Sequence, residues 1–406
     1  MTTQRAGTTA SGSGLRAIPR GVWALGFVSL FMDTSSELVH SLLPVFLVSV
    51  LGASMTSVGL IEGVAEATAL ITKIFSGTLS DYLGRRKALT VLGYGLAAVT
   101  KPLFPLAGSV GLVLTARLID RIGKGIRGAP RDALVADLSP PHLRGASFGL
   151  RQSLDTVGAF AGPVVAIVAM GLMANDIRAV FWIAVIPALM AISILLAFVN
   201  EPDRRTDGGS TRVPLRLADI KTLSPAYWAV VTVGAVLTLA RFSEAFLVLR
   251  ASGTGLGITF VPLVLVVMNM AYAASAYPAG VWSDRAGRPV VLLAGVGVLF
   301  VSDVVLAIAS TIWIVMIGVA LWGLHMGLTQ GLLATMVTDT APAPLRGTAF
   351  GVLNLIAGVA MLIASVLAGV LWDRFGASET FTGGAILCML ALVGFAYLGR
   401  RPAQRS

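Results

Sequence analysis

Long apolar runs constrain this chain more than any other feature of its sequence. A transmembrane helix needs about 20 mainly apolar residues, and twelve such runs follow one another with only short polar breaks between most of them. We therefore expect an all-α membrane protein with twelve transmembrane helices. The runs, referred to below as spans one to twelve, cover Val22–Leu51, Thr56–Ser80, Ala88–Ala107, Val110–Gly128, Gly145–Met173, Ala179–Val199, Ala226–Leu249, Ile258–Ser283, Val290–Ser310, Ile312–Thr338, Gly347–Leu371 and Phe381–Leu398.

Charged residues are scarce, and this scarcity limits the class of protein. They make up 12% of the 406 residues, against roughly 25% in a soluble domain, so we expect no cytosolic enzyme. The net charge of +10 would favour nucleic acid as a partner of a soluble protein. Here the basic residues lie in loops between apolar runs, and we expect no nucleic-acid partner. The single cysteine, Cys388, cannot form an intramolecular disulfide.

The basic residues also predict the orientation, because loops on the cytoplasmic side of a membrane collect Lys and Arg. If the N-terminus is cytoplasmic, that side receives most of the 30 Lys and Arg residues, and the opposite loops receive Arg178, Arg250 and Arg374. This asymmetry predicts a multi-pass protein of the cytoplasmic (inner) cell membrane, with both termini in the cytoplasm.

Two motifs recur at nearly one spacing, which indicates an internal repeat. The stretch Gly77–Lys87 returns as Gly280–Arg288, and Asp137–Gly149 returns as Asp339–Gly351, at offsets of 203 and 202 residues. We therefore expect two pseudo-symmetric six-helix bundles. The expected domains are a cytoplasmic tail (1–20), an N-terminal bundle (21–199), a cytoplasmic linker (200–225), a C-terminal bundle (226–399) and a second cytoplasmic tail (400–406).

On these motifs the sequence resembles the major facilitator superfamily over nearly its whole length. The Gly77–Lys87 loop matches that family's Gly-x-x-x-Asp-x-x-Gly-Arg-Arg-Lys signature. The resemblance implies a secondary transporter that works by alternating access. We expect Asp81 to pair with basic groups at a neighbouring helix end and to hold the outward-open state; the alternative is that the loop only sets topology by its charge. The candidate gating residues are Gly77, Asp81, Gly84, Arg85, Arg86, Gly280, Asp284, Gly287 and Arg288.

Span five carries a second family-like pattern. Gly158-Ala-Phe-Ala-Gly162-Pro163 resembles the core of the family's antiporter motif, although Ala166 departs from its trailing Gly pair. Gly158 and Gly162 lie four residues apart on one helical face, so a neighbouring backbone can approach closely, and Pro163 loosens the hydrogen-bond ladder. We expect these residues to serve helix packing and the rocking movement; ordinary small-residue packing is the alternative.

Ionised side chains inside the spans are costly unless they are paired or hydrated, so they form the candidate site. The candidate solute and proton-coupling residues are Asp33, Glu37 and His40 in span one, Glu62 and Glu66 in span two, Arg117, Asp120 and Arg121 in span four, Asp155 in span five, Arg241 and Glu244 in span seven, and His325 in span ten.

Two interpretations of these charges stay open. In the first, they bind solute and protons in a central cavity, which the resemblance lines with spans one, four, seven and ten. Burial disfavours the charged form of a carboxylate, so such a group can exchange a proton near neutral pH. In the second, Asp120 with Arg121 and Glu37 with Arg117 are static ion pairs that lock the bundle.

Other ligands are less well supported. The carboxylates and histidine of spans one and two suit a divalent cation, but the arginines of span four would repel it, and we assign no metal ligand. We expect no cofactor, and the absence of a Gly-x-x-x-x-Gly-Lys-Ser/Thr loop from the sequence gives no sign of an ATP-driven motor.

We therefore predict a proton-coupled secondary transporter, a monomer in the lipid bilayer whose partners are protons and a small solute. It exports an amphipathic or charged compound such as a drug, a siderophore-like compound or a metal complex. The alternatives are proton-coupled uptake of an organic anion, favoured by the basic groups in the spans, and a membrane-embedded enzyme, disfavoured by the repeat.

Overall fold

The computed structural model describes residues 17–83, 85–201, 220, 222–342 and 345–399, and in this part of the chain the ordered elements are helices without strands. The first six spans are α1 (Arg20–Val45) with the π-helical turn η2 (Phe46–Val50), α2 (Met55–Leu83), α3 (Arg86–Thr100) with α4 (Leu103–Leu106), α5 (Val110–Leu138), η3 (Pro141–Leu143) with α6 (Arg144–Leu172), and α7 (Ile177–Ile183) with α8 (Val185–Phe198). The last six are α9 (Pro225–Ala240) with α10 (Ala245–Gly253), η5 (Ile258–Phe260) with α11 (Leu263–Ala286), α12 (Arg288–Ile308), α13 (Ile312–Thr340), α14 (Arg346–Phe375) and α15 (Ala377–Gly399).

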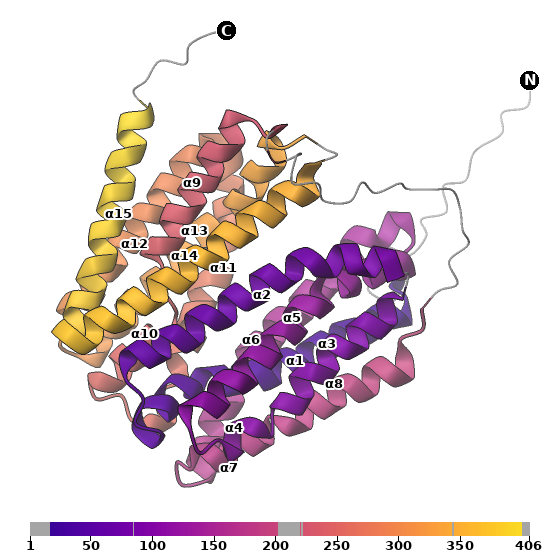
Figure 1. The fold of residues 1–406 in the computed structure, drawn as a ribbon, viewed down its shortest axis with the longest axis horizontal. Coiled ribbons are helices and arrows are strands. Elements are labelled where there is room, and N and C mark those ends of the chain that lie inside the picture. The colour runs from indigo at the N-terminus through magenta and orange to yellow at the C-terminus, as the bar shows by residue number, and fades with distance from the viewer. Residues whose placement is uncertain (1–16, 84, 202–219, 221, 343–344, 400–406) are drawn as a thin grey trace, which may run out of the picture.

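The predicted fold class is confirmed: twelve helical spans form two bundles of six. Figure 1 shows α1 to α8 gathered in one half of the molecule and α9 to α15 in the other. Among the described residues, nine helices are long and apolar enough to cross a membrane by themselves. The equally long α2 and α5 carry several charged side chains and fall outside this group, and α15 supplies a shorter apolar segment, Ala377–Val393.

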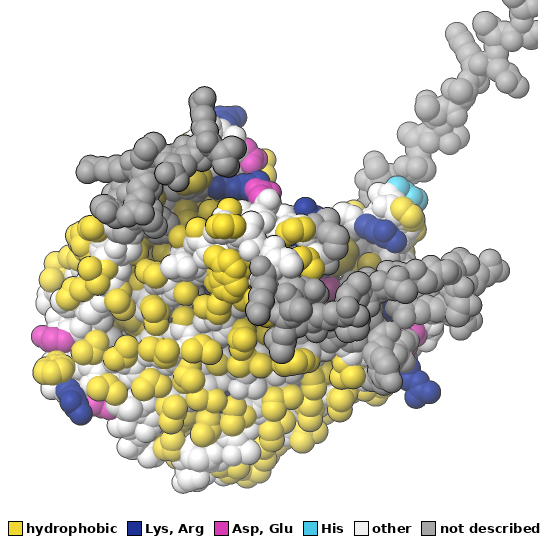
Figure 2. Space-filling view, turned by 45° about the horizontal axis from the view of Figure 1, so that its top comes forward, with side chains coloured by type: hydrophobic (Ala, Val, Ile, Leu, Met, Phe, Trp, Pro, Cys, Tyr) yellow, Lys and Arg dark blue, Asp and Glu magenta, His cyan; other side chains and the backbone are white. Residues whose placement is uncertain are grey.

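The outer surface suits a lipid environment. Large apolar side chains point outward from many helices; Leu172, Trp313 and Ile308 are 82%, 77% and 71% exposed. In Figure 2, apolar side chains cover much of the visible face, and charged ones gather at its margins. Because a soluble monomer rarely exposes an apolar surface of this extent, the surface is consistent with a protein embedded in a bilayer.

Glycines bring the helices of the N-terminal half together. A Cβ atom on Gly158 would lie 2.5 Å from the carbonyl oxygen of Leu30, and one on Gly162 would lie 2.7 Å from that of Thr34. The backbone of α6 therefore lies against α1, as the spacing of the two glycines predicts. This contact lies inside one half, so the role of these residues and of Pro163 in the rocking movement stays a prediction.

The two halves meet along α2 and α14, which run antiparallel side by side (Figure 1). Close approach again depends on glycine: a Cβ on Gly59 would lie 2.0 Å from the carbonyl oxygen of Ser365, and one on Gly369 would lie 2.4 Å from that of Met55. These contacts lie toward the end of the molecule opposite the chain termini, which we call the far end. It comprises the turns at 51–54, 107–109, 173–176, 254–257, 309–311 and 376.

Each half ties its own helices together at the opposite end, which we call the terminal end. The Arg86 guanidinium at the start of α3 pairs with Asp137 at the end of α5, and Arg288 at the start of α12 pairs with Asp339 at the end of α13. Arg288 lies 202 residues after Arg86, and Asp339 lies 202 residues after Asp137. The two repeated motifs of the sequence therefore meet each other in space, once in each half.

Candidate functional site

A cavity of about 220 Å³ lies between the two halves, and it brings together many of the predicted site residues. Both halves contribute charged groups to its wall, as expected for a carrier that binds its solute at the interface of two repeats. The lining residues are Glu37 and His40 of α1, Glu62 and Glu66 of α2, Arg121 and Lys124 of α5, Ala159 of α6, Arg241, Phe242, Ser243 and Glu244 of span seven, Leu265 and Asn269 of α11, and Met361 of α14.

A chain of alternating charges forms the wall on the side of the N-terminal half. Arg117 Nη2 lies 2.6 Å from Glu62 Oε2, and His40 Nε2 lies 3.5 Å from the same oxygen. The other ring nitrogen of His40, Nδ1, lies 3.4 Å from Glu37 Oε2. Arg117 and Glu62 are 3% and 1% exposed, so the ion pair closes the bottom of the wall, and His40 links it to the more accessible Glu37.

Two further ion pairs differ from those named in the second interpretation of the charges. Arg121 Nη2 lies 3.1 Å from Glu66 Oε1, and Asp120 Oδ1 lies 2.9 Å from Lys101 Nζ on α3. The pairings of Asp120 with Arg121 and of Glu37 with Arg117, which that interpretation named, are not the ones that form. Adjacent residues on a helix do not face each other, so Asp120 and Arg121 turn to different neighbouring helices.

Span seven is interrupted at the cavity. The helix α9 ends at Ala240 and α10 begins at Ala245, where we expected one continuous helix from the apolar run. The break places Arg241 and Glu244 at the cavity wall. Ser243 supports it: its backbone N–H donates to Ser365 Oγ of α14 at 3.2 Å, and its own hydroxyl accepts from the Ala245 N–H at 3.2 Å. Broken helices of this kind often form solute sites in carriers.

Five predicted residues do not line the cavity. Arg117 and Asp120 make the ion pairs described above, and the other three lie elsewhere in the described structure. Asp155 Oδ2 accepts from Arg151 Nη1 at 2.5 Å, one helical turn away on α6. Asp33 lies beside Gly158, where α1 and α6 pack. His325 is buried, and its Nδ1 lies 2.8 Å from the carbonyl oxygen of Gly295 on α12. These groups do not line the cavity, and their proposed part in solute binding or proton coupling stays untested.

The set of helices around the cavity also differs from the one that the resemblance implies. Spans one, four and seven contribute as expected, but so do spans two, five, eight and eleven, and no described residue of span ten lines the cavity. His325, the predicted site residue of span ten, contacts the Gly295 carbonyl of α12 instead.

Four polar residues at or near the site were not among the predicted ones. Lys124, Ser243 and Asn269 line the cavity, and Lys101, 1% exposed, holds Asp120. The two lysines could have been found from the sequence, because a cation is rarely placed inside an apolar span without a role. Nothing in the sequence around Asn269 distinguishes it from an ordinary polar residue of a membrane helix.

The candidate gating residues are only partly described. The side chains of Gly77 and Asp81 and the whole of Gly84 lie outside the described residues, so the expected pairing of Asp81 stays a prediction. Arg85, Gly280 and Asp284 are exposed. Gly287 separates α11 from α12 with a φ of 87°, a conformation that glycine adopts without steric cost.

Two sets of hydrogen bonds join the halves at the far end. The Asp373 carboxylate of α14 accepts from the backbone N–H groups of Met55 and Thr56 at 2.9 and 2.8 Å and from the Thr56 hydroxyl at 2.6 Å. Across the molecule, the Thr259 hydroxyl lies 2.5 Å from Asn175 Oδ1. The carboxylate of one half thus caps the first turn of a helix in the other half, where negative charge is favoured by the helix dipole.

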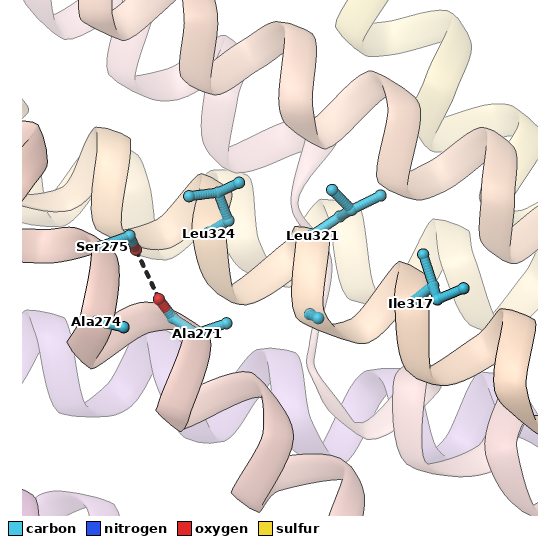
Figure 3. A pocket seen from close by; sticks show the side chains of 7 residues that line it. Ala271, Ala274, Ser275, Ile317, Leu321 and Leu324 are labelled. Atoms are coloured by element: carbon cyan, nitrogen blue, oxygen red, sulfur yellow. Dashed lines mark hydrogen bonds between the residues drawn. The ribbon is translucent and has the colours of Figure 1, made fainter.

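A second hollow, of about 440 Å³, lies between α11 and α13 and has a different character. Figure 3 shows the side chains of Ala271, Ile317, Leu321 and Leu324 along it. Its single polar side chain, Ser275, donates back to the Ala271 carbonyl of its own helix at 2.7 Å. With no charged lining residue, this groove offers nothing to bind an ion or to exchange a proton, so the interface cavity is the better candidate site.

Metal ligation is not indicated. Among the described residues, no three His, Cys, Asp or Glu side chains are grouped so that they could hold a metal ion. In the cavity wall, the carboxylates of α2 are engaged by arginines of α5, which would repel a cation.

Comparison with known proteins agrees with this architecture. The family model of the Major Facilitator Superfamily matches residues 25–260 and 245–406. An uncharacterized MFS-type transporter of Methanocaldococcus jannaschii is 31% identical over 383 residues, which cover 93% of this chain and 94% of the relative. A quinolone resistance protein, NorA of Staphylococcus aureus, is 26% identical over 54% of each chain.

Among solved structures, the nucleoside transporter NupG has a TM-score of 0.75 at 12% identity, and the match covers 94% of this chain and 99% of NupG. Such low identity shows the fold alone. Together with the two bundles, the internal repeat and the interface cavity, the match of the family model over nearly the whole sequence shows that this chain is a membrane-embedded, multi-pass transporter that belongs to the major facilitator superfamily.

Proposed function

We propose that the transporter couples the export of a small amphipathic or charged solute to protons. The observation that supports this proposal is the interface cavity, where carboxylates and bases of both halves meet. Solute binds there while Glu37, Glu66 or Glu244 is deprotonated, and protonation resets the carrier. Burial favours the protonated form of a carboxylate, and a neighbouring base favours the charged form. When Arg121 moves away from Glu66, Glu66 therefore binds a proton more readily, and when Arg121 returns, Glu66 releases it.

The far end faces the outside in this proposal, and both termini lie in the cytoplasm, because the loops at the terminal end hold most of the basic residues. The membrane is the cytoplasmic membrane, and the chain works as a monomer, since one chain supplies both halves of the cavity. In the structure the halves are joined at the far end. Outward opening therefore requires these hydrogen bonds to break.

Export is supported by the Gly158–Pro163 pattern and by the partial similarity to a quinolone resistance protein. The second candidate is proton-coupled uptake of an organic anion. Lys124 and Arg241 favour it, because both line the cavity and neither forms an ion pair within 4.0 Å with a carboxylate among the described residues.

Solute movement in proteoliposomes under an imposed pH gradient tests the proposal. A panel of drugs, siderophore-like chelators, metal complexes and organic anions is supplied on either side. We expect a solute to move against the proton flux, and Glu37→Gln and Glu66→Gln to remove its dependence on the gradient. The matched control, Glu379→Gln, changes an exposed carboxylate at the far end and should behave as the unmodified protein.

Each outcome separates the candidates. Movement of solute and protons in the same direction would contradict export and favour uptake. If no solute of the panel responds to the gradient, proton coupling is wrong. If both cavity variants respond like the control, Glu37 and Glu66 do not carry the coupling.

A further inference from the structure

We propose that the solute is a small organic anion carrying a single negative charge, which binds between Lys124 of one half and Arg241 of the other. This inference rests on the proposed function, because it names the solute class of the same cavity.

Most charged groups of the cavity wall already have partners inside the protein. Glu62 is held by Arg117 and His40, and Glu66 is held by Arg121. Glu37 is held by His40 as well. With His40 as the imidazolium between Glu37 and Glu62, three carboxylates and three bases balance in charge in this arrangement, so none of them needs an ion from outside.

Three lining groups differ from the rest. Within the described residues, Lys124, Arg241 and Glu244 make neither a hydrogen bond through their side chains nor an ion pair within 4.0 Å. Two of the three are cations. The part of the wall that is left for a ligand is therefore positive overall, and an anion is the ligand that complements it.

The depth of the two cations makes this arrangement informative. Lys124 lies at the middle of α5, about 21 Å from either end at 1.5 Å per residue. Arg241 lies at the break in the middle of Pro225–Gly253. A charged group at this depth is costly unless it is paired or hydrated, and a bound anion pairs both groups at once.

The chemistry of the two side chains suits a carboxylate or a similar head group. The planar guanidinium of Arg241 offers parallel N–H donors to two oxygens, and the ammonium of Lys124 adds a compact point charge. Because the two groups belong to different halves, one bound anion joins both halves. Occupancy of the site then acts directly on the equilibrium between arrangements of the halves.

Glu244 and the cavity size limit the anion further. Glu244 lies three residues after Arg241 and repels a second negative charge, whereas the amide of Asn269 accepts or donates a hydrogen bond. A volume of about 220 Å³ is below the roughly 300–1,000 Å³ of pockets that enclose drug-sized ligands. The fit is best for a small monoanion.

Thermal unfolding of the full-length protein in lipid nanodiscs tests this inference. A ligand that binds the folded state raises the unfolding midpoint. Monocarboxylates, dicarboxylates, quaternary ammonium ions and neutral sugars are compared at millimolar concentration and equal ionic strength. We expect stabilisation by monocarboxylates and an apparent affinity that falls about tenfold or more in Lys124→Gln and in Arg241→Gln. Lys124→Arg should retain binding, and Arg374→Gln, an exposed arginine at the far end, is the control.

Three results would each overturn the inference. The first is stabilisation by cations or neutral sugars alone, and the second is the lack of any shift with monocarboxylates. The third is equal monocarboxylate affinity in both Gln variants and the control. None of these results changes the outcome expected for solute movement under a pH gradient. Conversely, monoanion binding that depends on Lys124 and Arg241, without any response to a pH gradient, would support this inference and contradict proton coupling.

Discussion

The cap that Asp373 places on α2 gives the sharpest test of how the two halves separate. The substitution Asp373→Asn keeps the size of the side chain, removes its charge and replaces one acceptor oxygen by an amide donor that faces backbone N–H groups. The structure contains three hydrogen bonds to this carboxylate, from Met55 N, Thr56 N and Thr56 Oγ1. All three must break when the far end opens, so the substitution should favour the open arrangement.

The expected size follows from these contacts. A hydrogen bond to a charged group contributes about 1.5–3 kcal/mol when buried, and a charge at a helix N-terminus contributes about 0.3–1 kcal/mol. Asp373 is exposed, and solvent reduces both contributions. A net change of about 1–2 kcal/mol remains, which corresponds to a shift of about 5- to 30-fold in the ratio of open to closed molecules.

Distances between spin labels at the far end measure this shift. Cysteines that replace Met173 and Phe260, both exposed and in opposite halves, report the distance between the two halves at the far end. Labelling of the buried Cys388 is checked in the protein without added cysteines. Asp373→Asn should add a longer-distance population, whereas Glu379→Gln should not. An unchanged distance distribution in Asp373→Asn, with an unchanged unfolding midpoint, would refute the reasoning.

Two further predictions concern stability. Gly162→Ala should lower the unfolding midpoint by an amount that corresponds to about 1–3 kcal/mol, because its Cβ would lie 2.7 Å from the Thr34 carbonyl oxygen; Gly149→Ala, at an open position, is the control, and equal midpoints would contradict the packing. Arg117→Gln should destabilise by about 3–5 kcal/mol, because it leaves Glu62 buried without its strongest partner. The double variant Arg117→Gln with Glu62→Gln should recover part of that loss, and the absence of any recovery in thermal unfolding would contradict the pairing.

The architecture could be predicted from the sequence because it depends on features that are local or repeated. Apolar runs of span length indicated the twelve helices, and the recurrence of the 77–87 and 137–149 motifs indicated the two halves. The ion pairs Arg86–Asp137 and Arg288–Asp339 connect these motifs. Only the folded structure reveals that connection, because a repeated spacing does not say which motif meets which.

The pairing of charges could not be predicted, because it depends on how neighbouring helices are rotated. Asp120 turns to Lys101 and Arg121 turns to Glu66, although Asp120 and Arg121 are adjacent in the chain. The break in span seven was missed for a related reason. No Gly or Pro lies between Arg241 and Glu244, and the break is stabilised by Ser365 of another helix.

The most direct test of the whole account is the accessibility of the cavity from the two sides of the membrane. In a background in which Cys388 is replaced by Ser, a cysteine replaces Asn269, which lines the cavity, and a membrane-impermeant thiol reagent is added to right-side-out or to inside-out vesicles. We predict labelling from both sides, with labelling from the outside increased by Asp373→Asn. Labelling from one side only, or from neither, in both the single-cysteine protein and its Asp373→Asn variant would contradict a cavity that opens alternately to each face.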